Sequence, residues 1–114
     1  QIHLVYGNVD GDRENMKKIA DEFDNLKIYD EIGEIKVDNK KIIFTHYPWL
    51  AEKLAKEKKP DLIFYGHNHK PWEKPIGKTT LYNPGTLAGL FAKATFAIYD
   101  NKKNKAELII LKKI

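Results

Sequence analysis

The chain contains no cysteine and only one arginine, Arg13, among its 114 residues. Without cysteine it can form neither a disulfide framework nor a thiolate metal site. A single arginine argues against a nucleic-acid surface, which normally combines arginines with exposed aromatic side chains. No apolar run approaches the roughly 20 residues of a membrane span, and no charged-then-apolar leader opens the chain. We therefore expect a cytoplasmic protein with no membrane or nucleic-acid partner.

The charge is moderately positive. Twenty Lys and Arg residues against 16 Asp and Glu residues give a net charge of +4 and a pI near 9.1. Acidic residues interleave the lysines of the helical stretches, which is typical of a solvated surface rather than of a binding stripe. Branched and aromatic residues recur in strand-length clusters, which argues against disorder. A chain of this length forms a single domain, residues 1–114.

The hydrophobic pattern predicts two helices and seven or eight strands. Asp12 can cap a helix that starts at Arg13, and Pro48 suits the first turn of a helix over 49–58. The expected strands are 2–6, 26–32, 34–37, 41–45, 62–65, 79–82, 94–99 and 107–111. Residues 66–78 are expected to form a long loop, because Pro and Gly interrupt them. Strands and helices alternate early and strands dominate later, which predicts an α/β sandwich.

Three strands end in polar, sharply turned loops, at residues 6–10, 44–48 and 65–69. Ligands collect at the carboxyl ends of strands in open α/β sheets. Asn8, His46 and the pair His67 and His69 all lie in these loops. Three imidazoles and an amide oxygen make a plausible metal site with nitrogen and oxygen ligands.

Each of these residues also has a structural interpretation. Asn8 alone is more often a left-handed turn residue. His46 alone is more often a structural histidine, and His3 within a strand is expected to be structural. The pattern Gly-His-x-His after an apolar strand is more specific. The combination of all three motifs, each after a strand, favours a metal site.

These motifs resemble those of the calcineurin-like metallophosphoesterases, in particular their small single-domain bacterial and archaeal phosphodiesterases. The matching stretches are 7–10, 45–46, 66–69, 83–86 and 94–100, so that the resemblance covers essentially the whole chain. It implies an α/β fold, a metallophosphoesterase-like αββα sandwich, truncated here at the N-terminus. It also implies a phosphate ester substrate.

The resemblance further implies a dinuclear metal centre whose bridging hydroxide attacks phosphorus. By this pattern Asn8, His46 and His67 serve one metal and His69 the other, and these four residues form the catalytic site; Asp10 is a weaker candidate. Two divalent ions about 3.5–4 Å apart clamp phosphate oxygens for in-line attack. Mn²⁺ is the metal we favour, with Ni²⁺, Zn²⁺ or Fe as alternatives.

The chain departs from the family pattern at its start. The family opens with Asp-x-His, which is absent here, and then Gly-Asp, whereas Gly11-Asp12 follows the Asn motif. Val9 stands where many relatives place a proton-donating His, and Tyr47 replaces a frequent Gly. We therefore expect at most one tightly held metal. We also expect an unpaired sheet edge, with homo-oligomerisation or a companion N-terminal fragment.

A second hypothesis is a catalytically degenerate or incomplete domain that acts as a binding module, since a relative of this fold is a scaffold in the retromer. A nucleic-acid binder is a third hypothesis that rests on the pI alone. Trp49, Trp72 and Phe91 are candidates to shape substrate entry, although packing is the role we expect for them.

Overall fold

The computed structural model describes residues 1–111, which contain two helices and nine strands. The helices are α1 (Arg13–Ala20) and α2 (Pro48–Lys58). The strands are β1 (Ile2–Val5), β2 (Leu26–Tyr29), β3 (Ile32–Val37), β4 (Lys40–Thr45), β5 (Leu62–Phe64), β6 (Trp72–Ile76), β7 (Thr79–Asn83), β8 (Thr95–Asp100) and β9 (Lys105–Ile110). Within the described residues, neither helix has the length and apolar character needed to cross a bilayer.

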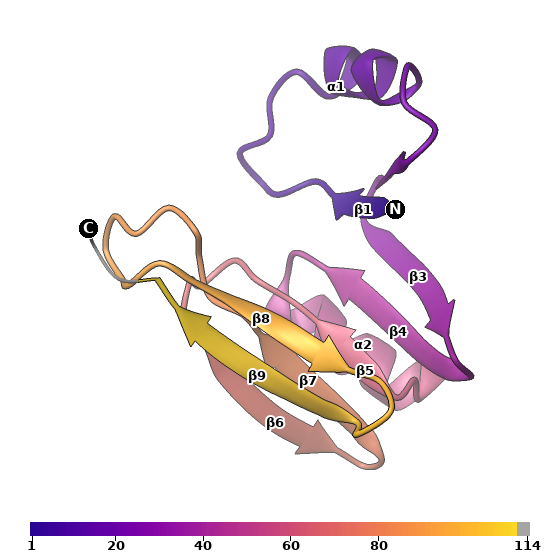
Figure 1. Cartoon of the computed structure of the whole chain (residues 1–114), viewed down its shortest axis with the longest axis vertical. Coiled ribbons are helices and arrows are strands. Elements are labelled where there is room, and N and C mark those ends of the chain that lie inside the picture. Colours follow the sequence, from indigo (N-terminus) through magenta and orange to yellow (C-terminus); the bar gives the residue numbers. More distant parts are fainter. Residues whose placement is uncertain (112–114) are drawn as a thin grey trace.

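Five strands form the central sheet, in the order β3-β4-β5-β7-β6 (Figure 1). Strands β4, β5 and β7 run parallel, while the edge strands β3 and β6 are antiparallel to their neighbours. Two smaller sheets accompany it: β1 and β2 pair in parallel, and β8 and β9 form an antiparallel hairpin. The α/β class predicted from the sequence is confirmed.

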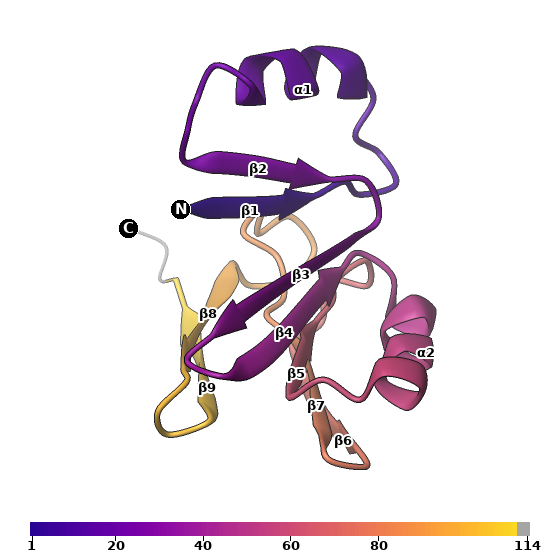
Figure 2. The same ribbon diagram turned by 90° about the vertical axis from the view of Figure 1, so that its right-hand side faces the viewer.

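The central sheet is covered on both faces (Figure 2). Helix α2 packs Ala51, Leu54 and Ala55 against the buried Ile43 and Ile63. The β8–β9 hairpin covers the other face, where Ala97, Tyr99 and Ala106 pack on Ile42, Leu62 and Tyr82. Strands β4 and β5 are thus enclosed between two layers, which explains their continuous apolar runs.

Helix α1 begins as predicted, because the Asp12 carboxylate accepts a hydrogen bond from the backbone N–H of Asn15 at 3.1 Å. The helix ends at Ala20, so that Phe23 lies beyond it and is 54% exposed. Among the residues of the helix itself, only Ala20 is buried. Helix α1 packs on β2 with little apolar area.

Two predictions about strands are wrong. Gly33 lies inside β3 rather than between two strands, because a glycine there makes room for the Phe44 ring on the neighbouring strand. Residues 66–78 are not all loop, since β6 pairs with β7 through a turn at Gly77 and Lys78. Pro75 is tolerated because β6 is an edge strand.

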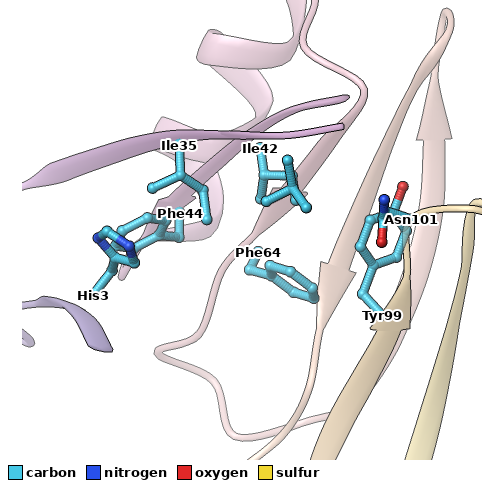
Figure 3. Close-up of a pocket in the computed structure, with 8 residues that line it drawn as sticks. His3, Ile35, Ile42, Phe44, Phe64, Tyr99 and Asn101 are labelled. Atoms are coloured by element: carbon cyan, nitrogen blue, oxygen red, sulfur yellow. The ribbon is translucent and has the colours of Figure 1, made fainter. Parts of the chain in front are cut away.

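A groove opens on the inner face of the central sheet, between β1 on one side and β8 on the other (Figure 3). Its floor is apolar and includes Ile35, Phe44 and Phe64. His3 lines the β1 side, and its Nδ1 lies 3.0 Å from the Tyr29 hydroxyl. Within residues 1–111, β1 pairs with β2 alone, so that the β1 edge beside the groove is open.

Candidate functional site

The three polar loops follow β1, β4 and β5, and the sheet brings two of them together. Strands β4 and β5 are parallel neighbours, so their carboxyl ends lie side by side. The loops are tied directly, because the Gly66 N–H donates to the His46 carbonyl at 3.0 Å. The loop after β1 joins them through side chains rather than through the sheet.

Side chains from all three loops converge on the imidazole of His46. Its Nε2 atom lies 2.7 Å from Oδ1 of Asn8 and 3.2 Å from Nδ1 of His67. These residues are separated in sequence by 38 and 21 positions, so that only the tertiary fold brings them together. Two imidazole nitrogens and an amide oxygen are a donor set that suits first-row divalent ions.

The environment of His46 favours its neutral form. Burial lowers the pKa of His46 below its usual 6.5, and the nearby rings of His67 and His69 lower it further. The carboxylate of Asp10 acts in the opposite direction without overcoming these effects. A neutral imidazole offers a free lone pair, which is the form that coordinates a metal.

Gly7 and Asp10 shape the loop after β1. The Asp10 carboxylate accepts a hydrogen bond from the Gly7 backbone N–H at 2.6 Å, and Arg13 donates to the carbonyls of Gly7 and Asp10. These hydrogen bonds close the loop around Asn8 and hold its backbone in place. Asp10, the weaker candidate ligand, is engaged in this loop rather than in a contact with Asn8 or His67 among the described residues.

The loop after β5 is held in an uncommon conformation. His67 and His69 both have positive φ angles, +78° and +60°, which bulky residues adopt rarely. Asn83, fully buried at the end of β7, fixes the residue between them by donating from Nδ2 to Oδ1 of Asn68 at 2.7 Å. Oδ1 of Asn83 accepts from the Gly85 N–H at 2.9 Å. Sequence reasoning gave Asn83 no role, although its place between a strand and Pro-Gly was visible.

His69 lies outside the hydrogen-bonded cluster of the other three predicted residues, although it is near enough to His46 to lower the pKa of that imidazole. It is exposed, and among residues 1–111 it makes no hydrogen bond to Asn8, His46 or His67. No group of three or more His, Asp or Glu side chains within that range is arranged to hold a metal ion. The convergent set is thus two histidines and an amide.

Two aromatic side chains border this cluster. The rings of Tyr47 and Trp49 stack with their centroids 4.6 Å apart, and each lies within 5.4 Å of the His67 ring. Trp49 is 61% exposed, so that it lies outside the core and packs at the surface against Tyr47. From the sequence, Tyr47 was notable only because it stands where many members of the family have glycine.

Comparison with known proteins identifies the family. A model of the calcineurin-like phosphoesterase superfamily domain matches residues 1–104. A phosphodiesterase of Methanocaldococcus jannaschii is 28% identical over 113 residues, which are 96% of this chain and 68% of that protein. The solved structure of an archaeal phosphodiesterase matches with a TM-score of 0.85 at 28% identity, again covering 96% of this chain and 68% of the other. The chain belongs to the calcineurin-like phosphoesterase superfamily, as its motifs predicted.

More distant structures share the fold. Vps29 of Entamoeba histolytica, solved in complex with Zn²⁺, matches with a TM-score of 0.59 at 18% identity and covers 95% of this chain and 81% of its own. Vps29 of Chaetomium thermophilum matches with a TM-score of 0.61 at 14% identity, covering 96% and 76%. These likenesses confirm the metallophosphoesterase fold.

Proposed function

We propose that this chain is a metal-dependent phosphodiesterase whose metal is held by Asn8, His46 and His67. The observation that supports this most directly is the convergence of Asn8 Oδ1 and His67 Nδ1 on His46 Nε2, within 2.7 and 3.2 Å. The family and the phosphodiesterase relative at 28% identity support the reaction class. Mn²⁺ is the ion we favour, with Ni²⁺, Zn²⁺ or Fe as alternatives.

When bound, a divalent ion supplies Lewis acidity, which polarises a phosphoryl oxygen and lowers the pKa of water. The protein contributes three things to this chemistry. His46 presents a lone pair at neutral pH because its pKa is lowered. Hydrogen bonds among Gly7, Asp10 and Arg13 hold the loop that carries Asn8. Asn83 holds the loop that carries His67.

A dinuclear centre would draw on His69 for its second ion. The exposure of His69, and the lack of a hydrogen bond from it to Asn8, His46 or His67 among residues 1–111, support one tightly held ion rather than two. We therefore propose that the first ion is bound by this chain's own three donors, and that His69 contributes to a second, weaker position.

Hydrolysis of bis(p-nitrophenyl) phosphate tests the function, because p-nitrophenolate leaves without protonation by an acid. We expect Mn²⁺-dependent hydrolysis by the chain and its loss in His67→Ala. His3→Gln is the matched control, since His3 lies in the groove beneath the sheet and bonds Tyr29 instead of the cluster. Activity that survives His67→Ala would overturn the proposed site.

The second candidate function is a binding module without catalysis. It is favoured by the exposed apolar side chains of the loop after β7, namely Leu87, Leu90 and Phe91, of which Phe91 is 98% exposed. Such a surface is typical of an interaction site. Absence of hydrolysis in the unsubstituted chain, with Mn²⁺ bound, would favour this candidate.

A further inference from the structure

Four aromatic rings form one continuous surface at the candidate site. The His46 ring lies 4.9 Å from Tyr47 and 5.1 Å from His67, edge to face in both cases. Trp49 extends this surface outward by stacking on Tyr47 with the ring planes 24° apart. We call Tyr47 and Trp49 the aromatic platform.

The platform has no role in the hydrophobic core. Trp49 lies in the first turn of α2, whose core face is instead formed by Ala51, Leu54 and Ala55. An indole left 61% exposed forgoes most of the free energy that burial of a large aromatic side chain supplies. Tyr47 precedes the helix and makes no side-chain capping bond to it. Neither packing nor capping explains why two aromatic side chains stand here.

The position of the platform relates it to the candidate metal ligands. Trp49 lies 5.4 Å from the ring of His67, whose Nδ1 is 3.2 Å from His46 Nε2. A phosphate held at the three donors would therefore have the platform immediately beside it. A flat group attached to that phosphate would meet π-faces rather than water.

We propose that the aromatic platform receives a planar aromatic group of the substrate, so that the site selects phosphoesters bearing a nucleobase or an aryl ring over alkyl phosphoesters. This inference rests on the proposed function for the position of the phosphate. Stacking on aromatic side chains tolerates any base, because every base has a π-face. The platform therefore defines a class of substrates and not one sequence or nucleoside.

Fluorescence provides a test that does not need turnover. The chain has two tryptophans, so that Trp72→Phe leaves Trp49 as the single reporter. In the Trp72→Phe variant with Mn²⁺, we expect AMP and phenyl phosphate to quench the Trp49 emission. Their apparent dissociation constants should be about tenfold lower than those of ribose 5-phosphate and inorganic phosphate, measured by competition. Tenfold is within the range that stacking of one base contributes. Absence of quenching, or equal affinities for AMP and ribose 5-phosphate, would overturn the proposal.

Inhibition of bis(p-nitrophenyl) phosphate hydrolysis supplies the second arm. We expect AMP to inhibit about tenfold more tightly than ribose 5-phosphate, Trp49→Ala to remove this preference, and Trp49→Phe to retain most of it. Phe23→Ala is the matched control, because Phe23 is a similarly exposed aromatic residue at the opposite end of the β1–β2 pair. An unchanged preference for AMP in Trp49→Ala would overturn the proposed role of the aromatic platform.

The two arms separate the platform from the proposed function. Quenching by AMP in a chain that hydrolyses nothing supports the platform and contradicts the phosphodiesterase. Hydrolysis without any AMP preference contradicts the platform alone. Trp49→Ala removes an exposed side chain, so that its fold is preserved, and Trp49→Phe provides an independent check of this.

Discussion

A Cβ atom added to Gly7 would lie 3.2 Å from Cε1 of His46 and 3.4 Å from a carboxylate oxygen of Asp10. The backbone of the loop after β1 thus approaches the candidate ligand so closely that an added Cβ would require the His46 ring to shift by a few tenths of an ångström. We predict that Gly7→Ala lowers Mn²⁺ affinity about tenfold, as expected when the support of a ligand is displaced. Isothermal titration calorimetry measures this. Gly11→Ala is the control, since an added Cβ there meets nothing within 4 Å; an equal loss in both variants would contradict the prediction.

The lowered pKa of His46 predicts how stability responds to pH in the metal-free chain. His46 resists protonation in the folded state, whereas the unfolded chain takes up a proton near pH 6.5. The folded state therefore loses stability as the pH falls below about 6.5, and it incurs no such loss above that value. Thermal unfolding in EDTA between pH 7.5 and 5 should show a falling Tm. His46→Gln should show a smaller fall; an identical fall would contradict the assignment to His46.

The geometry of the candidate ligands predicts the metal stoichiometry. Asn8, His46 and His67 converge, while His69 is exposed and makes no hydrogen bond to them among the described residues. We expect titration with Mn²⁺ to reveal one tight ion per chain, and His46→Ala to abolish it. Two tight, adjacent ions, which electron paramagnetic resonance would reveal as a coupled pair, would refute this prediction.

Gly33 predicts a stability effect away from the site. It is buried opposite Phe44 in the β3–β4 ladder, and an added Cβ would overlap the Phe44 ring. The ring is confined by the edge of Tyr29, whose centroid is 5.3 Å away. We expect Gly33→Ala to destabilise the chain by about 1–3 kcal/mol in urea unfolding, the usual effect of overpacking.

A compensating variant checks the cause of that loss. Leucine in place of Phe44 removes the ring that the Cβ would meet, so that the double variant Gly33→Ala/Phe44→Leu should lose less than the sum of the two single variants. Strict additivity would show that the overlap is not responsible.

The open edge of β1 beside the apolar groove predicts self-association. A strand edge left open next to Ile35, Phe44 and Phe64 offers both backbone hydrogen bonds and apolar surface to a second copy of this chain. Sedimentation equilibrium should show a mass that rises with protein concentration. Ile35→Lys should suppress this rise, whereas a clean monomer at all concentrations would count against the prediction.

Local sequence signals predicted most of the elements, because their causes are local. Asp12 and Pro48 mark the starts of the two helices as the structure has them, and the run 62–65 marks the strand enclosed between layers. The turn at Asp38 and Asn39, both with positive φ, joins β3 to β4 as a hairpin. The predictions for Gly33 and β6 were wrong because a glycine or proline, taken locally, indicates the end of a strand. Only the neighbouring strands show why β3 accommodates its glycine and β6 its proline.

The candidate ligands could be proposed from the sequence, but the residues that hold them in position could not. Histidines that follow strand ends can be recognised in the sequence, and the structure brings two of them, His46 and His67, together with Asn8. The tie between Asn83 and Asn68 joins two motifs 15 residues apart, and nothing in either motif specifies the pairing. The stacking of Tyr47 on Trp49 likewise depends on the direction in which α2 leaves β4.

The buried Asn83 couples the loop after β5 to the pairing of the central sheet. The loop carrying His67 and His69 is fastened to the end of β7, and β7 is itself paired in parallel with β5. A change that separates β5 from β7 would therefore also release this loop, even if it lay far from the candidate ligands.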